Sequence, residues 1–425
     1  MTRILLALAL LGASAALSAQ PVAIIHARAM PVASAPVDDA TIVLADGRVQ
    51  SVVAHGAPPA GARVVDAGGH VVTPGLIGAA SQLAIVEVLS AADTNDQSVA
   101  SGPLGPAFDV QYALNSNSAL LAVARADGLT RAMTYPGGAA TAPFSGMGAL
   151  IRLVPFGDIL DRPRAAMFAV VGGGSQSRAG GSRAAQWTLL RNALDEARRY
   201  ASAPRSTGMR DQLLNRLDIE ALVPVLARTM KLAIHADRES DIRQVIRLAS
   251  EKKIDVVVIG GAEAWRAANE LAAAHIPVIL DPEVDLPQTF DAIGGRLDNA
   301  ALLAKAGVTI AFSVSGNGIY LSYGAGIDLR EGAGIAVANG LSYAAALAAM
   351  TSGPAAIWGI AHAGRLSPGA DADVVIWDGD PLEPASAPLA VFVQGTETSL
   401  VTRQTALRDR YRPGHTGDAM PPAYR

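Results

Sequence analysis

The sequence of 425 residues contains no cysteine, which excludes disulfides, CxxC redox motifs, thiolate zinc sites and cysteine nucleophiles together. Only four of its 34 basic residues are lysines, so candidates for a Schiff base or a carbamylated lysine are few. Aromatic residues make up 4% of the chain, which leaves little material for base-stacking platforms or aromatic sugar clefts. Because the formal net charge is −4, the composition argues against nucleic acid as the main partner.

What the sequence has in abundance is apolar residues, at 50% of the chain, and this predicts a globular protein rather than a disordered one. Residues 1–19 resemble a secretory signal, with Arg3, an apolar run and then small residues. The apolar run is shorter than the roughly 20 residues of a membrane span, although a retained anchor is the alternative. We therefore expect an exported protein, periplasmic or secreted, with no membrane contact after cleavage following Ser18 or Ala19.

Short β-like segments occur at both ends of the chain. Residues 40–54 read ATIVLADGRVQSVVA, in which Asp46-Gly47 separates two apolar segments as in a hairpin. Residues 371–380 and 389–400 have the same character. We therefore expect one small β domain assembled from residues 20–72 and 364–403, followed by a tail over 404–425.

The middle of the chain, residues 73–363, alternates strands with helices. KLAIHA (231–236) and IDVVVI (254–259) predict strands, and the helix between them has apolar residues at Ile242, Val245, Ile246 and Ala249. IPVIL (276–280) and VTIAFSV (308–314) continue the series, and residues 129–135 and 165–171 fit the same role. Such β-rich strands, each followed by a helix, predict a parallel α/β sheet. The length suits a (β/α)₈ barrel of about 250 residues, and a doubly wound sheet is the alternative.

Four segments carry a family resemblance. VVDAGGHVVTPGLIGAASQL (64–83) and GRLSPGADADVVIWDGDPLE (364–383) resemble the ends of the amidohydrolase superfamily, in particular its imidazolonepropionase-related branch. IHADRESDI (234–242) and GGAEAWRAANELAAAHIPVIL (260–280) resemble interior segments of the same branch. The resemblance implies a (β/α)₈ barrel plus a composite β-sandwich built from both chain ends. It also implies hydrolysis of C–N bonds in amides by water activated on one or two divalent metals.

The metal ligands that this resemblance implies are mostly missing. Ala80 and Gln82 occupy the positions of the His-x-His pair after the first strand. The fourth strand has Ala166 and Met167 but no lysine, and Gly260-Gly261 replaces the sixth-strand histidine. Where the eighth strand should end in an aspartate, the chain offers Ser313, Ser315 and Asn317. Only the fifth-strand ligand is present, as His235.

A catalytic zinc needs three protein ligands, so we expect no tightly bound metal at the barrel mouth. The other histidines lie outside the mouth. A rebuilt site from Glu87, Asp237, Glu263 and Asp281 is the alternative, although carboxylates alone suit Mg²⁺ or Ca²⁺ better than a hydrolytic zinc. Zinc would be a cofactor only if the site were rebuilt in this way.

We take His235 as the candidate catalytic residue. The candidate ligand pocket comprises polar side chains near the predicted strand ends: Glu87, Asp237, Arg238, Asp281, Ser315 and Asn317. The glycine-rich segment VVGGGSQSRAGGSR (170–183) lacks the GKS or GKT ending of a P-loop and predicts only a strand-to-helix loop at the barrel mouth.

Three functions are compatible with these residues. The first is a degenerate amidohydrolase that binds a small-molecule ligand or partners an active paralogue. The second is a hydrolase of non-peptide C–N bonds with a rebuilt site, and the third is a non-catalytic scaffold. The tail contributes a further expectation, because its arginines could dock on carboxylates of a neighbouring subunit in a homo- or hetero-oligomer.

Overall fold

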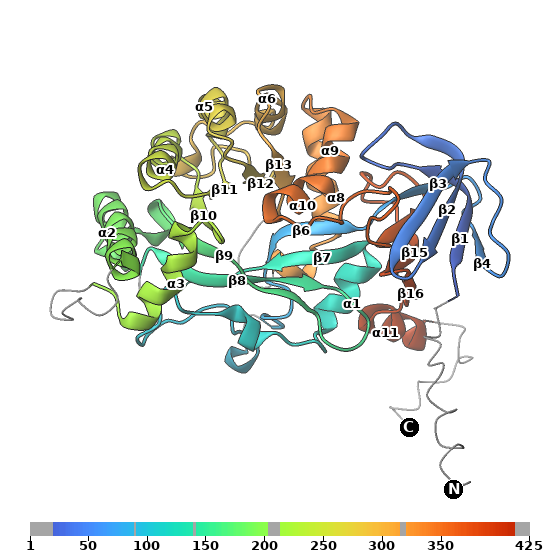
Figure 1. The fold of residues 1–425 in the computed structure, drawn as a ribbon, viewed down its shortest axis with the longest axis horizontal. Helices are drawn as coiled ribbons and strands as arrows, with labels where there is room; N and C mark the ends of the chain where they lie inside the picture. Colours follow the sequence, from blue (N-terminus) through green and yellow to red (C-terminus); the bar gives the residue numbers. More distant parts are fainter. Residues whose placement is uncertain (1–19, 89–90, 139–141, 203–212, 315–319, 413–425) are drawn as a thin grey trace, which may run out of the picture.

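The computed structural model describes residues 20–88, 91–138, 142–202, 213–314 and 320–412. Two bodies lie side by side, a large barrel with helices and a smaller sheet built from both ends of the chain (Figure 1). Within the described ranges, no helix combines the length and the apolar character that crossing a membrane requires. The signal predicted over residues 1–19 lies outside the described residues.

The smaller sheet has eight strands and confirms the predicted composite domain. Its strand order is β16-β15-β14-β5-β1-β2-β3, and β4 pairs in parallel with β1. The strands are β1 (Val22–Ala29), β2 (Val37–Ala45), β3 (Arg48–Ala54), β4 (Arg63–Asp66), β5 (Val71–Pro74), β14 (Val374–Trp377), β15 (Pro388–Val393) and β16 (Thr396–Thr398). The β5–β14 pair joins the two chain ends, because Val375 opposes Thr73 in antiparallel register.

The larger sheet is a nearly closed barrel, so the barrel expected from the sequence is confirmed over a doubly wound sheet. Its strand order follows the chain from β6 to β13. The strands are β6 (Leu76–Ser81), β7 (Leu129–Thr134), β8 (Phe144–Arg152), β9 (Leu160–Val170), β10 (Lys231–Ala236), β11 (Val256–Gly260), β12 (Val278–Leu280) and β13 (Ile310–Phe312).

One strand departs from the regular repeat. β8 runs antiparallel to both β7 and β9, whereas the other neighbouring pairs that share hydrogen bonds are parallel. The carboxyl end of β8 therefore points to the opposite end of the barrel, and the first residues of β8 lie at the mouth instead. As a result Ser145, near the start of β8, lies at the barrel mouth.

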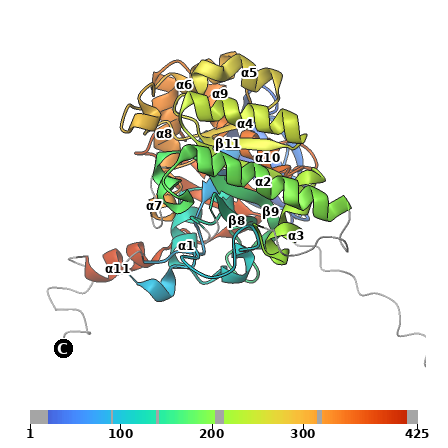
Figure 2. The same ribbon diagram turned by 90° about the vertical axis from the view of Figure 1, so that its left-hand side faces the viewer.

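Helices cover the outside of the barrel (Figures 1 and 2). They are α1 (Ala119–Ala126), α2 (Arg183–Ser202), α3 (Arg216–Leu226), α4 (Glu239–Lys252), α5 (Ala268–Ala273), α6 (Asn299–Lys305), α7 (Tyr320–Tyr323), α8 (Ile327–Ala338), α9 (Tyr343–Ala349) and α10 (Ser352–Trp358), with α11 (Arg403–Tyr411) after the small sheet. α4 follows the predicted periodicity, since Ile242 and Val245 are fully buried against the barrel. Short 3₁₀ turns occupy η1 (Ala92–Thr94), η2 (Val110–Ala113), η3 (Gly173–Ala179), η5 (Ala264–Ala267) and η6 (Phe290–Ala292).

The two bodies are joined by a buried tryptophan and a buried ion network. Trp377 is fully buried at the junction and donates its indole N–H to Thr73 Oγ1 at 2.9 Å. Beside it, Arg131 of β7 contacts carboxylates of the barrel and of the segment before β14. The orientation of the small domain is therefore fixed at the amino-terminal end of the barrel, away from the mouth.

Candidate functional site

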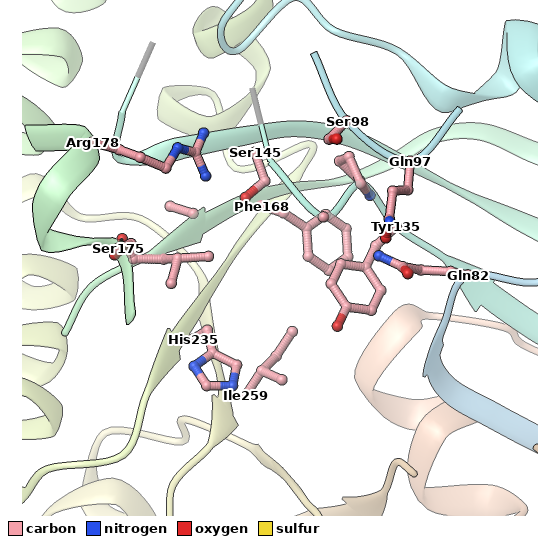
Figure 3. A pocket seen from close by; sticks show the side chains of 14 residues that line it. Gln82, Gln97, Ser98, Tyr135, Ser145, Phe168, Ser175, Arg178, His235 and Ile259 are labelled. Carbon is pink, nitrogen blue, oxygen red and sulfur yellow. Dashed lines mark hydrogen bonds between the residues drawn. The ribbon is translucent and has the colours of Figure 1, made fainter. Parts of the chain in front are cut away.

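A pocket of about 430 Å³ opens at the barrel mouth (Figure 3). Strands β6, β7, β9, β10 and β11 bring their carboxyl ends to it, as expected for sites in barrels of this type. The loop after β6 and the turn η3 complete its wall. The lining residues are Gln82, Gln97, Ser98, Tyr135, Pro136, Gly137, Ser145, Phe168, Ala169, Val170, Ser175, Arg178, His235 and Ile259.

The floor beneath this pocket is apolar where the family resemblance implies metal ligands. Ala80 is 3% exposed and belongs to a cluster inside the barrel that includes Phe168, Ile259 and Trp358. Among the described residues, no group of three or more histidine, aspartate or glutamate side chains is placed to hold a metal ion. A dication here would face methyl and aromatic groups and one imidazole, so these residues do not fit the catalytic zinc that the resemblance implies.

His235, the candidate catalytic residue, lines the pocket near Asp237. Nδ1 of His235 lies 3.8 Å from Oδ2 of Asp237, beyond hydrogen-bond distance. Gly260 makes room for both side chains, because a Cβ at this position would clash with the Asp237 carboxylate and lie 3.2 Å from Nε2 of His235. The glycine that replaces the expected sixth-strand ligand therefore admits a His–Asp pair instead.

Two buried side-chain oxygens at the mouth, one in Gln82 and one in Ser145, have no hydrogen-bond partner among the described residues. Gln82 is 2% exposed, and its Oε1 accepts no hydrogen bond. Ser145 is 1% exposed, and its Oγ is likewise without a partner. A buried polar atom that makes no hydrogen bond destabilises the folded chain by about 1–3 kcal/mol. Both residues line the pocket, so a bound molecule could supply the missing contacts.

Aromatic rings form one wall. Tyr135 and Phe168 stack with their centroids 4.9 Å apart and 21° between their planes. Burial raises the pKa of the Tyr135 hydroxyl to about 12, which keeps this group neutral at physiological pH. This wall is therefore aromatic and uncharged.

Arg178 enters the pocket from η3, opposite Gln82 (Figure 3). Its Nη1 packs over Gly138, where an added Cβ would lie 2.5 Å from that nitrogen. A Cβ at the preceding residue, Gly137, would lie 3.0 Å from Nε2 of Gln82. Burial lowers the pKa of the Arg178 guanidinium. Because these two adjacent residues are glycines, the side chains of Gln82 and Arg178 can both pack against the backbone of residues 137–138.

The turn that carries Arg178 is anchored from across the mouth. Asp291 in η6 accepts a hydrogen bond from the backbone N–H of Gly173 at 2.6 Å, and it pairs with Arg183 at the start of α2. On the barrel side, Ser175 donates to the Val170 carbonyl at 3.1 Å. The glycine-rich segment lies at the mouth as the sequence predicted, but it is also a wall of the pocket.

The other predicted pocket residues lie around the mouth without lining this cavity. Glu87 accepts a hydrogen bond from Asn115 at 3.0 Å. Arg238 precedes α4 and bonds Ser240 at 2.6 Å. Asp281 follows β12 and accepts the N–H of Glu283 at 3.1 Å. The remaining two candidates, Ser315 and Asn317, lie outside the described residues.

Carboxyl groups gather beyond β12, next to the pocket. Burial, together with the nearby charges of Asp281 and Asp237, raises the pKa of Asp285 to about 8, against a hydrogen bond from Asn299. Burial and nearby carboxylates likewise raise the pKa of Glu283 to about 7. At neutral pH Asp285 is therefore largely protonated, so this group adds little negative charge near the mouth.

Most of the pocket was not identifiable from the sequence. Tyr135 and Phe168 lie on predicted strands, but nothing in a strand pattern marks a ring that faces a cavity. Ser145 belongs to β8, which the sequence analysis did not predict. Arg178 had a weak signal, since it is a lone cation inside a glycine-rich loop at a barrel mouth.

Comparisons with known proteins agree with the fold. The model of the Amidohydrolase family matches residues 209–403. The amidohydrolase tasK of Hapsidospora irregularis is 46% identical over 57 residues, or 13% of this chain, and the chain spans 6% of that protein's length.

Solved structures extend the likeness to most of the chain. The crystal structure of an amidohydrolase from Thermotoga maritima MSB8 matches with a TM-score of 0.79 at 24% identity, over 89% of this chain and 99% of that one. N-isopropylammelide isopropylaminohydrolase from Burkholderia multivorans ATCC 17616 matches with a TM-score of 0.50 at 16% identity, over 89% and 98% of the two chains. Residues 209–403 therefore match the model of the Amidohydrolase family, and the barrel with its composite sheet has the fold of these solved structures.

Proposed function

We propose that this chain is a degenerate amidohydrolase, which binds a small molecule at the barrel mouth without a catalytic metal. The observation that carries the proposal is Gln82, which occupies the position of a metal-binding histidine and has a buried, unpartnered Oε1. A ligand N–H or O–H would satisfy this atom. The cavity volume of about 430 Å³ lies within the usual range for small-molecule sites.

The first test is metal content. We expect protein expressed with added zinc and purified without chelator to hold far less than one zinc per chain by mass spectrometry. The Ala80→His/Gln82→His variant, which restores the His-x-His pair, is the matched control and should retain more zinc. Stoichiometric zinc in the wild type, with loss of ligand binding when zinc is removed, would overturn the proposal.

The second test uses the unpartnered amide. Gln82→Met keeps the length of the side chain and removes the buried acceptor. If Gln82 binds a ligand, the free energy of unfolding of this variant, measured in urea, should be about 1 kcal/mol above that of the wild type. The variant should also bind the ligand more weakly. Lower stability of the variant would mean that Gln82 has a structural role, and would count against the proposal.

A second candidate function is hydrolysis of a C–N bond at a rebuilt site. His235 faces the pocket beside Asp237, and this pair could act as a general base oriented by a carboxylate. The test is turnover of a panel of cyclic and linear amides by the wild type and by His235→Ala. Turnover that resists EDTA and disappears in the variant would favour hydrolysis over simple binding.

Export and association belong to the same proposal. We propose that the protein acts in the periplasm or is secreted, which fractionation of cells expressing the tagged chain tests. α11 carries no buried residue, and Arg408 and Arg410 lie in its last turn. We propose that this arm contacts a second copy or an active paralogue, so deletion of residues 404–425 should lower the oligomeric state measured by light scattering. An unchanged oligomeric state, both for the chain alone and with the paralogue, would contradict the proposed role of the arm.

A further inference from the structure

A second pocket lies at the end of the barrel opposite the mouth. Its cavity of about 240 Å³ is found where the barrel strands begin, because Lys231 is the first residue of β10 and Asp255 directly precedes β11. The lining residues are Arg162, Arg164, Ala165, Arg228, Thr229, Met230, Lys231, Asp255, Trp358 and Gly359. This pocket is separate from the one at the mouth and takes no part in the function proposed above.

The described residues that line this second pocket are strongly basic. Two of the lining arginines are paired with acids: Arg228 lies 2.7 Å from Asp255, and Arg164 lies 2.7 Å from Asp109, which is outside the lining. Two positive charges remain after these pairs are formed, although the formal net charge of the chain is −4. The basic lining side chains are Arg162, Arg164, Arg228 and Lys231, and the acidic one is Asp255.

Arg162 and Lys231 account for the surplus, because they bond to the backbone at the end of α10. Lys231 Nζ donates to the carbonyl of Ile357. Arg162 donates through Nη2 to the carbonyl of Trp358, and through Nη1 to that of Gly359 at 3.4 Å. These three carbonyls are consecutive in the chain, so the two cationic groups lie next to each other. The end of a helix carries only about half a negative charge, which cannot neutralise two cations.

The carboxylates that act electrostatically on this pair are engaged with other cations. Asp161 pairs with two arginines at the junction of the two bodies. Oδ1 of Asp255 accepts from Nε and Nη2 of Arg228 at 3.1 and 2.7 Å. Burial lowers the pKa of Lys231, Asp255 opposes this effect, and the charge of Arg162 adds to the lowering. Arg162 and Lys231 therefore repel each other across the lining, and among the described residues neither forms an ion pair.

The surplus charge indicates the ligand. A phosphate group carries a charge of about −1.5 to −2 at pH 7, which matches two cations without an acidic partner. Its oxygens accept charge-assisted hydrogen bonds from lysine and arginine side chains. Because the end of α10 already holds both cationic groups in place, little side-chain freedom is lost when an anion binds.

We propose that this second pocket binds a phosphate group, with its oxygens on Lys231 Nζ and the Arg162 guanidinium. Arg164 and Arg228 are 55% and 62% exposed, and they lie at the rim where they add to the positive potential. Inorganic phosphate and the phosphate of a monoester share this chemistry. A sulfate monoester has the same shape as a phosphate monoester but one negative charge fewer, so it should bind more weakly.

The experiment compares inorganic phosphate, methyl phosphate and methyl sulfate at about pH 8 and constant ionic strength. Dissociation constants come from isothermal titration calorimetry of the full chain, with circular dichroism to confirm that each variant is folded. For the wild type we expect a dissociation constant below about 1 mM for methyl phosphate, and binding at least about tenfold tighter than that of methyl sulfate. Tighter binding of inorganic phosphate than of methyl phosphate would identify the free ion as the ligand, and the reverse order would identify a monoester.

Three variants test the assignment of the residues. Lys231→Met keeps an unbranched side chain without the charge, and it should weaken binding of methyl phosphate at least about tenfold. Because Lys231 also bonds to α10, Arg164→Gln is a second variant that leaves α10 untouched, and it should weaken binding about threefold. Arg216→Gln is the matched control, because Arg216 is likewise exposed and ion-paired but lies outside the lining, so its loss should leave binding unchanged.

Equal binding of methyl phosphate and methyl sulfate to the wild type would overturn the inference, as would dissociation constants above about 1 mM for both phosphates. Equal weakening by Arg164→Gln and Arg216→Gln would also overturn it, because the effect would then reflect overall charge and not a site. If Lys231→Met does not fold, the comparison of Arg164→Gln with Arg216→Gln decides. The proposed function is tested separately, by zinc content and by the stability of Gln82→Met.

Discussion

Arg131 provides the sharpest test of how the two bodies are held together. Its side chain is 2% exposed and contacts three carboxylates. Nε lies 3.0 Å from Asp373, Nη1 lies 2.7 Å from Asp161, and Nη2 bonds Asp371. The perturbation is Arg131→Met, which keeps an unbranched side chain and removes the charge.

The expected loss follows from what remains after the substitution. Asp371 keeps two cations, Arg48 and Arg152, the latter at 3.2 Å. Asp373 is 5% exposed and keeps a hydrogen bond from the backbone N–H of Gln394 at 2.8 Å, but among the described residues its ion pair is with Arg131. Removing one member of a buried ion pair and stranding the other destabilises a protein by about 3–5 kcal/mol. We expect a loss of that size for Arg131→Met.

The assay is urea unfolding followed by tryptophan fluorescence, to which Trp377 at the junction contributes together with the three other tryptophans. Arg48→Met is the matched control, because Arg48 is 42% exposed and its partner Asp371 retains two other cations. That variant should lose less than about 1 kcal/mol. In the double variant Arg131→Met/Asp373→Asn, part of the loss should be recovered because the stranded charge is gone.

Two results would refute this reasoning. One is a loss below about 1 kcal/mol for Arg131→Met, since a buried charge left unpaired cannot be so inexpensive. The other is an equal loss for Arg131→Met and Arg48→Met, because the difference in burial would then carry no energetic meaning.

Three further predictions concern the mouth. Burial and neighbouring carboxylates raise the pKa of Asp285 to about 8, so the unfolded state loses this proton at lower pH than the folded state does. The stability of the wild type should therefore fall as the pH rises from about 4 to 8. In urea unfolding at each pH, Asp285→Asn should be more stable than the wild type, by up to about 5 kcal/mol at pH 8. Gly260→Ala should be less stable than Gly369→Ala in thermal unfolding, because both glycines have φ near +80° but only the Cβ at 260 meets Asp237. Asp291→Ala should release η3 and raise its amide hydrogen exchange.

Each has a clear contradictory outcome. A stability gain at Asp285→Asn that does not grow with pH would show that its charge is not the cause. Equal losses at the two glycines would mean that the contact with Asp237 costs nothing. Unchanged exchange in η3 would remove Asp291 as its anchor.

The sequence by itself determined the class of fold. The β10–α4–β11 unit was predictable because continuous β-branched strands and a 3.6-residue apolar period are local properties, readable one element at a time. The composite domain was predictable because strand patterns and turn residues recur at both chain ends. The sequence also showed Ala80, Gln82 and Gly260 at positions where the family resemblance implies metal ligands, since this comparison depends only on residue identity at motif positions.

Only the tertiary structure decided the rest. β8 escaped prediction because it is buried on both faces and rich in small residues, so its antiparallel pairing depends on partners distant in sequence rather than on its own pattern. The pocket likewise depends on segments that are distant in sequence. Gln82, Ser145 and Arg178 come from three separate segments, and whether a polar atom is buried without a partner is a property of everything packed around it.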